Sequence, residues 1–268
     1  MELTRRRVRK LWLTVAKPRY PIDTKLADFA ATASPENTAV YAPIRNPATH
    51  YIYRYLTEFV VKTLETQSNQ PLEDLRVLDW GGGKGYAAYF LQSKGANVTL
   101  YETSTFQHQA IWKEFALDAK TSPANGKLPF KDGTFDAIVG FGVLEHVPYD
   151  YEALKELNRV LKPAGLLFVF NLPNKMGYVH KLAWARGVRY HDRLYGRGEV
   201  RRLLKRAGFN TIGRPWFRQL LPKNFIVYKM PRLVEYLDLF ATNHTPLAYF
   251  AASLEFVARK QHAYTSDH

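Results

Sequence analysis

A cluster of glycines between two apolar segments constrains the fold of this chain most strongly. Four of the five residues from 81 to 85 are glycine, and they follow the apolar run 76–80, which carries Asp79 near its end. Glycine inside a regular element costs about 0.5–1 kcal/mol relative to alanine. Such a cluster therefore indicates either a tight turn or a stretch of backbone that a ligand approaches closely.

The rest of the sequence alternates short apolar runs with helical patterns. Strands are predicted at 76–80, 97–102, 135–140, 166–171 and 253–259, with a turn at 162–165. Helices are predicted at 47–65, 86–93, 107–117, 151–161 and 199–207. Compact apolar strands that alternate with helices are typical of an α/β fold, in which helices cover both faces of a parallel sheet.

The spacing of the glycines narrows the kind of ligand. A strand, an acid, a glycine-rich turn and a helix form a nucleotide-binding element, because the helix N-terminus offers free N–H groups. The dinucleotide fingerprint G-x-G-x-x-G is absent, since Tyr86 stands where its last glycine would be. A phosphate loop is excluded because Gly85 follows Lys84 directly. Glu102 ends the second predicted strand, where an acid can hold both hydroxyls of a ribose.

The segment VLDWGGGKG at 77–85 resembles motif I of the class I S-adenosylmethionine-dependent methyltransferases. Residues 128–174 are similar to the second half of the same domain, with the phrases LPF, FD, LEHV and ALKELNRVLKPAGLL in the family's order. The resemblance covers 75–212. It implies a Rossmann-like, doubly wound α/β fold with a mostly parallel seven-stranded sheet, helices on both faces and an antiparallel last strand. It also implies methyltransferase activity with S-adenosylmethionine as the cofactor.

The resemblance further implies which residues bind the cofactor. Asp79 and the glycines would line its methionine part, and Glu102 would hold its ribose. Asp118 would meet the adenine amino group, or else be an ordinary acid at a helix end. The family usually contacts the cofactor through backbone at the positions of Gly140 and Phe141. The full set is Asp79, Trp80, Gly81, Gly82, Gly83, Gly85, Glu102, Thr103, Asp118, Gly140 and Phe141.

Histidines supply the candidates for acid–base chemistry. His146 is the candidate catalytic base, because an imidazole accepts a proton near neutral pH. The alternative is that the phrase LEHV is part of the scaffold. His180, His191 and Asp192 could face the acceptor or lie on the surface. The chain has no cysteine, so thiolate metal ligands are excluded, and no metal site is predicted.

The positive charge is unevenly distributed. The formal net charge is +14, and residues 1–20 carry seven basic and one acidic side chain, while residues 171–218 carry twelve and two. These segments flank a nearly neutral glycine-rich half, which favours an anionic partner or membrane surface; a solvated surface is the alternative. No signal peptide or membrane-spanning run is evident. A cytoplasmic location is expected, with peripheral membrane contact as an option.

Four segments are predicted along the chain. Residues 1–70 form a basic, helical N-terminal cap, 71–218 the cofactor-binding core, 219–250 a helical insertion, and 251–268 the final strand and tail. In the insertion, Leu233, Val234, Leu237 and Phe240 recur at helical spacing after Pro231. The insertion could therefore be an apolar lid over the acceptor site, or it could pack into the core.

These observations predict an enzyme that transfers a methyl group from S-adenosylmethionine to an oxygen, nitrogen or carbon atom of a small-molecule acceptor. Anionic, amphiphilic and lipid-linked acceptors all fit the flanking segments. An RNA methyltransferase that uses the basic segments is one alternative, although no recognisable RNA-binding module is found. A non-catalytic, cofactor-binding partner subunit is another. The identity of the acceptor and the oligomeric state stay open at this point.

Overall fold

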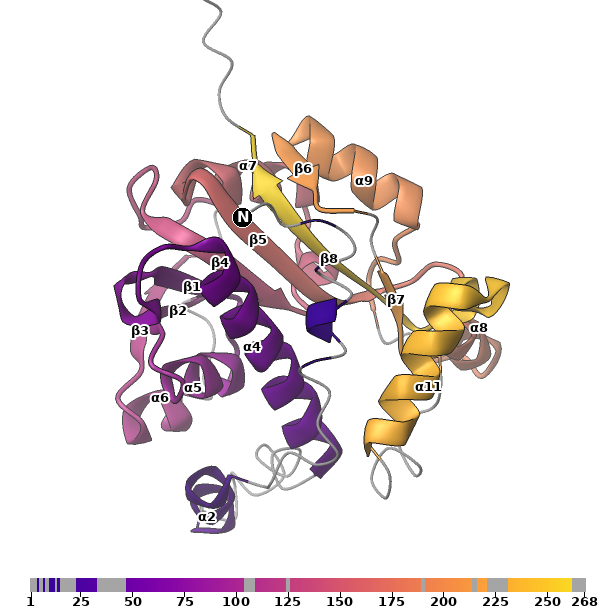
Figure 1. Ribbon diagram of the computed structural model, residues 1–268, viewed down its shortest axis with the longest axis horizontal. Helices are drawn as coiled ribbons and strands as arrows, with labels where there is room; N and C mark the ends of the chain where they lie inside the picture. Colours follow the sequence, from indigo (N-terminus) through magenta and orange to yellow (C-terminus); the bar gives the residue numbers. More distant parts are fainter. Residues whose placement is uncertain are drawn as a thin grey trace, which may run out of the picture.

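The computed structural model describes residues 4, 7, 10–12, 14, 23–32, 47–103, 109–123, 126–188, 191–213, 216–220 and 231–261. Within them, one β-sheet lies between two layers of helices (Figure 1). None of the helices in this part of the chain combines the length and the apolar character that crossing a membrane requires.

The sheet contains eight strands in the order β3-β2-β1-β4-β5-β8-β6, and β7 also pairs with β8. The strands are β1 (Arg76–Trp80), β2 (Asn97–Thr103), β3 (Asp118–Ser122), β4 (Phe135–Phe141), β5 (Leu161–Pro173), β6 (Phe209–Thr211), β7 (Trp216–Arg218) and β8 (Ser253–Lys260). The pairs among β1 to β5 are parallel, whereas β8 runs antiparallel to β5, β6 and β7. The predicted Rossmann-like fold, with its antiparallel last strand, is therefore confirmed. The strand beyond the seven predicted is β7, which pairs with the part of β8 that β6 leaves free.

Helices cover both faces of the sheet, as the alternating pattern predicts. Val77 belongs to the core that contains side chains of α4, α5 and α6, and its neighbour Leu78 belongs to the core that contains those of α7 and α9. This alternation follows from the two-residue period of a strand. The helices are α2 (Thr24–Thr32), α4 (Pro47–Gln67), α5 (Tyr86–Gln92), α6 (Ala110–Glu114), α7 (Asp150–Val160), α8 (Tyr178–Ala185), α9 (Arg197–Arg206) and α11 (Pro231–His244), with the 3-10 turns η2 (Leu72–Asp74), η3 (Leu144–His146) and η4 (Pro246–Phe250).

Two predicted elements differ from the structure. The turn predicted at 162–165 lies inside β5, where the register against β4 shifts and Ala164 adopts a φ of +61°. The predicted turn is therefore an irregularity within one long strand and does not separate two elements. The helix predicted at 107–117 is reduced to α6, which ends before Ala116, a residue with a φ of +47°. Residues 107 and 108 lie outside the described part of the chain.

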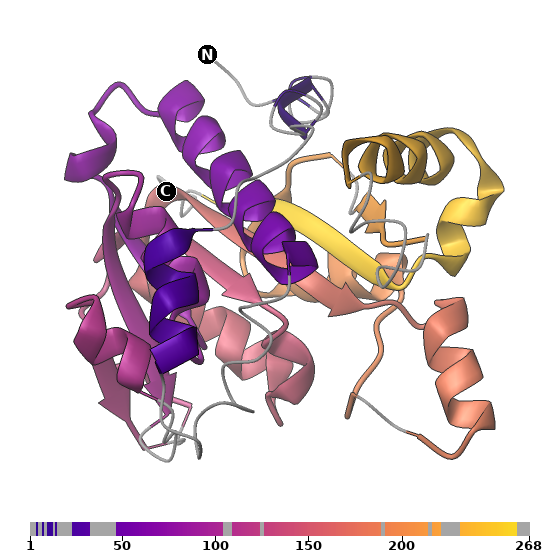
Figure 2. The ribbon, with the colours of Figure 1, turned by 90° about the horizontal axis from the view of Figure 1, so that it is seen from below.

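Parts of the N-terminal segment pack onto the same core as α4. The Trp12 ring is 3% exposed and stacks on Phe59, with 3.8 Å between ring centroids. The Tyr55 hydroxyl donates a hydrogen bond to the Trp12 carbonyl at 3.2 Å. Further along, α2 buries Leu26 and lies on the side of α5, whose Tyr89 hydroxyl reaches the Asp23 carboxylate at 2.8 Å (Figure 2).

Candidate functional site

The glycine turn begins at the carboxyl end of β1. The N–H groups of Gly81 and Gly82 both donate to the Tyr101 carbonyl of β2, at 2.9 and 3.1 Å. Gly81, Gly83 and Gly85 have φ values of +66°, +51° and +92°, a region that side chains with a Cβ rarely adopt. The turn therefore requires glycine for its backbone shape at three of its four glycines.

The space around these glycines separates them into two kinds. A Cβ at Gly81 would lie 2.5 Å from the Val143 side chain, and one at Gly85 would lie 2.8 Å from Leu117. At Gly83 the nearest atom outside its chain neighbours is the Gly81 carbonyl oxygen, at 4.0 Å. Gly81 and Gly85 thus allow close packing within the protein, whereas the position beside Gly83 is open to a ligand.

Glu102 and Trp112 both form hydrogen bonds with the backbone of Gly83. Glu102 Oε2 accepts a hydrogen bond from the Gly83 N–H at 3.0 Å, and Oε1 accepts one from the Thr103 N–H at 2.8 Å. The Trp112 indole of α6 donates to the Gly83 carbonyl at 2.9 Å. The acid that the sequence assigns to a ribose therefore lies directly beside the open glycine.

Asp79 is a buried carboxyl group beneath the turn. It is 1% exposed, and its Oδ2 accepts a hydrogen bond from the Ala88 N–H of α5 at 3.0 Å. Burial raises the pKa of Asp79 to about 7; the Ala88 hydrogen bond opposes this and the negative charge of Glu102 adds to it. A cation bound nearby would favour the charged carboxylate.

Tyr53 of α4 also belongs to this group, although it is not among the residues predicted from the sequence. Its ring lies 5.5 Å from both the Tyr86 and Phe141 rings, between centroids. Burial raises the pKa of Tyr53 to about 12, and the charge of Asp79 contributes to this. Tyr53 lies off the apolar stripe of its helix, so helical periodicity alone could not identify it.

The other predicted cofactor residues lie in different surroundings. The Trp80 side chain is buried in the core on the α7 side, and a Cβ at Gly140 would lie 3.1 Å from its ring. Packing against Trp80 therefore accounts for the glycine at position 140. Phe141 is half-buried at the end of β4, and its ring packs against those of Tyr53 and Phe170.

Asp118 is not brought to this group. It is the first residue of β3, whereas Thr121 is the residue of β3 that pairs with Glu102. At a strand rise of about 3.3 Å per residue, Asp118 lies roughly 10 Å further along the strand. Partial burial would raise the pKa of Asp118, but hydrogen bonds from Lys120 and Thr99 outweigh it and the pKa is lowered. Its carboxylate is a partner for neighbouring strand residues rather than for the turn.

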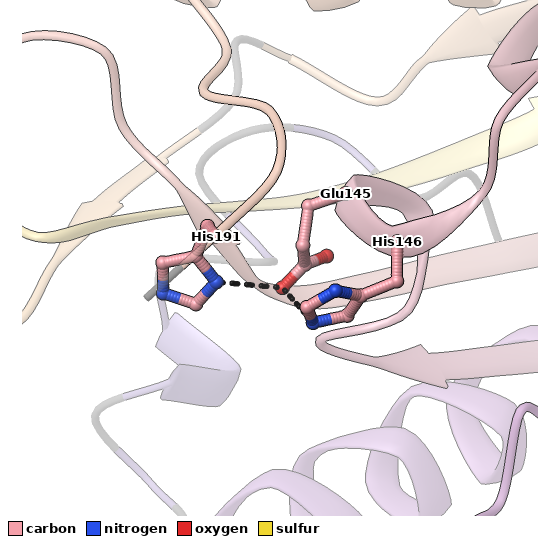
Figure 3. A group of neighbouring side chains, drawn as sticks. All are labelled: Glu145, His146 and His191. Atoms are coloured by element: carbon pink, nitrogen blue, oxygen red, sulfur yellow. Dashed lines mark ion pairs between the residues drawn. The ribbon is translucent and has the colours of Figure 1, made fainter. Parts of the chain in front are cut away.

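A cluster of titratable side chains lies beyond the end of β4, the strand that pairs with β1 (Figure 3). It contains Glu145 and His146 of η3, which follows β4, and His191, which lies beyond α8. Glu145 Oε1 lies 3.9 Å from His146 Nε2 and 3.7 Å from His191 Nδ1. Val143, two residues before Glu145, packs against Gly81 of the glycine turn, so the segment that carries the cluster also contacts the turn.

The three side chains differ in exposure. Glu145 is 2% exposed, and burial raises its pKa to about 7, against the opposing effects of a backbone hydrogen bond and of His146. The His146 side chain is 50% exposed, and its Nδ1 lies 3.2 Å from Asp192 Oδ2. Burial lowers the pKa of His191, and the neighbouring His180 and His146 lower it further. The four histidine and aspartate residues singled out from the sequence are thus neighbours in the fold.

The helices α8, α11 and η4 lie at one end of the molecule (Figures 1 and 2), and each carries exposed apolar side chains. We call this set the apolar end surface. Its residues, each more than a third exposed, are Val179, Leu182, Trp184, Leu233, Tyr236, Leu237, Phe240, Leu247, Tyr249 and Phe250 of α8, α11 and η4. Exposed apolar patches of this kind commonly mark sites for ligands, partners or membranes.

The sheet order and the glycine turn define the class of protein, a Rossmann-like α/β methyltransferase fold. Residues 48–213 match the family model of a methyltransferase domain. The chain therefore belongs to this methyltransferase domain family. Class I methyltransferases of this fold use S-adenosylmethionine as the methyl donor.

Individual relatives agree with this assignment. The chain is 27% identical over 166 residues to a ubiquinone biosynthesis O-methyltransferase of Colwellia psychrerythraea, covering 57% of this chain and 65% of that protein. It is 30% identical over 157 residues to the rice chloroplastic 2-methyl-6-phytyl-1,4-hydroquinone methyltransferase 2, covering 54% and 43%. The chain thus spans less than two thirds of the length of these curated relatives. A crystal structure of an S-adenosylmethionine-dependent methyltransferase from Thermotoga maritima has the same fold, with a TM-score of 0.58, 17% identity and 87% and 98% coverage.

Proposed function

We propose that this chain transfers the methyl group of S-adenosylmethionine to an amphiphilic small-molecule acceptor. The observation that carries the proposal is the open position beside Gly83, next to the Glu102 carboxylate. A cofactor whose methionine part follows the turn would pass over Gly83, and its ribose hydroxyls would reach Glu102. The cationic sulfonium would also favour the charged form of the nearby Asp79.

The apolar end surface supports an amphiphilic acceptor. Leu237 and Phe240 of α11 are 45% and 54% exposed, and Trp184 of α8 is 50% exposed. In this proposal they contact an apolar tail, and α11 acts as the lid expected for the 219–250 insertion. Two of the relatives are named for ubiquinone biosynthesis and for a phytyl hydroquinone, which are apolar-tailed molecules. Exposed basic residues of α9, among them Arg201 and Arg202, would attract an anionic surface nearby.

The reaction needs few protein groups, because the sulfonium already activates the methyl group. Holding the acceptor atom in line with the methyl group supplies roughly 7–11 kcal/mol of the barrier reduction. His146 is the proposed proton acceptor for a hydroxyl acceptor. Its contact with Asp192 orients the ring and leaves Nε2 facing Glu145. A carbon or nitrogen acceptor would rely on His146 less.

The test is a transfer assay with S-adenosylmethionine carrying a tritiated methyl group. The full chain is incubated with a lipid extract, a water-soluble small-molecule fraction and an RNA fraction. We expect label in an organic-soluble product, and a large loss of that label in a Glu102→Ala variant. Label that ribonuclease releases would identify an RNA methyltransferase instead. Cofactor binding with no labelled product in any fraction would identify a non-catalytic partner subunit.

A second variant tests the acceptor part of the proposal. Replacing Phe240 by serine removes an exposed apolar contact of α11, so we expect a higher KM for a lipid-linked acceptor and unchanged cofactor affinity. Tyr149, which is 73% exposed and lies outside the apolar end surface, provides the matched control as Tyr149→Ser. Equal effects of the two substitutions on KM would contradict a role for α11 in acceptor binding.

A further inference from the structure

We propose that Glu145, His146 and His191 bind one divalent transition-metal ion, with Zn²⁺ as the best match. Their ligand atoms all lie within 4.8 Å of one another. Glu145 Oε1 lies 3.7 Å from His191 Nδ1 and 3.9 Å from His146 Nε2. Figure 3 shows both rings directed toward the carboxylate. No metal site was predicted from the sequence, in which cysteine is absent.

The separations are close to those of a metal site. Zn²⁺ binds histidine nitrogen and carboxylate oxygen at about 2.0–2.2 Å, so tetrahedral ligands lie roughly 3.4 Å apart. The side chains need to move by only some tenths of an ångström to about one ångström to reach this arrangement. Two histidines and a glutamate with an open fourth position form a ligand set that catalytic zinc sites use. Mg²⁺ prefers oxygen ligands, so this set disfavours it.

Unsatisfied buried atoms point independently to a missing ligand. Glu145 is 2% exposed, and its Oε2 has no hydrogen-bond partner in the described part of the chain. His191 Nδ1, also buried, makes no hydrogen bond either and faces the Glu145 carboxylate. A buried carboxylate oxygen that receives no hydrogen bond is costly to remove from water. A cation bound between Glu145 Oε1 and His191 Nδ1 would compensate the charge of the buried carboxylate and would give the imidazole nitrogen a partner.

The surrounding residues hold the ligands in position. Asp192 contacts His146 Nδ1 at 3.2 Å, so Nε2 is the nitrogen left for a metal, as in many carboxylate–histidine–metal arrangements. The His180 ring lies 5.2 Å from the His191 ring and is itself fixed by the Ala252 carbonyl, 2.9 Å from its Nε2. These contacts restrict both imidazoles without occupying the proposed ligand atoms.

A buried tyrosine ties the two ligand-bearing segments together. Tyr195 lies four residues after His191 and is fully buried, and its hydroxyl donates to the Leu144 carbonyl of η3 at 3.2 Å. Arg193 forms an ion pair with Asp150, the first residue of α7, at 2.5 Å. The contacts of Tyr195 and Arg193 therefore hold the chain after His191 against η3 and α7, and this keeps His191 close to Glu145.

The role of the ion follows from its place and rests on the proposed function. The exposed His146 side chain opens the site to solvent and leaves room for an acceptor oxygen. A coordinated hydroxyl would lose its proton to water more easily. The resulting oxygen anion would attack the methyl carbon, the O–C bond would form, and the electron pair of the broken C–S bond would stay on sulfur as S-adenosylhomocysteine. In the metal-loaded chain His146 is then a ligand rather than the base.

The experiment is calorimetric titration of the full, chelator-treated chain with Zn²⁺. We expect one ion per chain, and at least tenfold weaker binding in the variants His146→Gln and His191→Gln. His244→Gln is the matched control, because His244 is an exposed histidine of α11 outside the cluster. S-adenosylhomocysteine binding, measured on every variant, reports whether the fold is retained. Mg²⁺ should bind much more weakly than Zn²⁺.

The outcomes separate this proposal from the proposed function. Stoichiometric Zn²⁺ binding that both variants retain unchanged, or no such binding at all, would overturn the metal site while leaving cofactor binding and methyl transfer intact. Equal affinity for Mg²⁺ and Zn²⁺ would also contradict the ligand chemistry. If Zn²⁺ binds as expected but no methyl group is transferred to any acceptor, the metal site stands and the proposed function fails.

Discussion

Replacing Gly83 by alanine should separate cofactor binding from folding, with Gly95→Ala as its control. Both glycines have a positive φ, +51° and +90°, and neither has an atom closer than 4.0 Å to an added Cβ outside its chain neighbours. Each alanine should therefore cost about 1–2 kcal/mol of folding free energy, for the left-handed backbone alone. Only the methyl group at position 83 would enter the space proposed for the cofactor.

Crowding in a well-packed site typically costs about 1–3 kcal/mol. Because about 1.4 kcal/mol corresponds to a tenfold change in affinity, we expect Gly83→Ala to weaken S-adenosylhomocysteine binding roughly tenfold to a hundredfold. Gly95→Ala should leave binding unchanged. Gly81→Ala adds a clash at 2.5 Å with Val143, so its total loss of stability should reach about 2–5 kcal/mol.

Urea denaturation gives the free energy of unfolding of each variant, and isothermal titration calorimetry gives the affinity for S-adenosylhomocysteine. Native-like affinity in Gly83→Ala would refute the reasoning, because the open position would then not be ligand space. Equal losses of affinity in Gly83→Ala and Gly95→Ala would refute it as well, since both effects would reflect lost stability.

Three further predictions concern pH, the buried ion pair and the membrane. The pKa of Asp79 is raised from 3.8 to about 7, so the protonated carboxyl group stabilises the fold fully below pH 4, by at most roughly 4 kcal/mol, and this contribution is lost as the pH rises through 7. In urea denaturation of the cofactor-free chain, the free energy of unfolding should therefore depend less on pH between 5 and 8 in Asp79→Asn than in the wild type. An unchanged pH dependence in this variant would contradict the assignment to Asp79. Arg218 and Glu255, with side chains 3% and 0% exposed, are 3.0 Å apart. Arg218→Ala should lower the free energy of unfolding by about 3–5 kcal/mol, because it leaves the buried Glu255 carboxylate without its cationic partner. A loss below 1 kcal/mol would show that the hydrogen bonds from Asn171 and Ser253 compensate this carboxylate on their own. Replacing Arg5, Arg6 and Arg7 by alanine should reduce sedimentation of the protein with anionic vesicles, and added salt should reduce it too. The affinity for the cofactor should stay constant in this variant, of whose three positions Arg5 and Arg6 lie outside the described residues. A wild-type chain that stays in the supernatant at low salt would exclude membrane contact.

The sequence predicted the central strands well because they are apolar on both faces. Val77, Leu78 and their neighbours form a compact run, and β1 has the predicted bounds. The edge strand β3 was missed, because its residues, DAKTS, contain no large apolar side chain. It pairs only with β2 at the edge of the sheet. Its position is therefore fixed by backbone hydrogen bonds, which an apolar sequence pattern does not predict.

Only those parts of the candidate site that lie in a short, recognisable sequence pattern could be predicted from the sequence. The glycine turn and Glu102 follow from spacing along two neighbouring strands. The approach of His191 to Glu145 depends on α8 and on the contacts of Tyr195, over 46 residues of chain, and no periodicity encodes it. Tyr53 reaches the turn because α4 crosses the sheet at that place, which is a matter of helix packing.

The central claim, that the edge formed by the glycine turn and Glu102 binds S-adenosylmethionine, is tested most directly by calorimetry of the full chain. We expect S-adenosylmethionine and S-adenosylhomocysteine to bind with one site per chain at about micromolar affinity. Glu102→Ala should weaken both by roughly tenfold or more, because it removes charge-assisted hydrogen bonds worth about 1.5–3 kcal/mol. Tight binding of NAD without binding of S-adenosylmethionine, or an unchanged affinity in Glu102→Ala, would contradict the account.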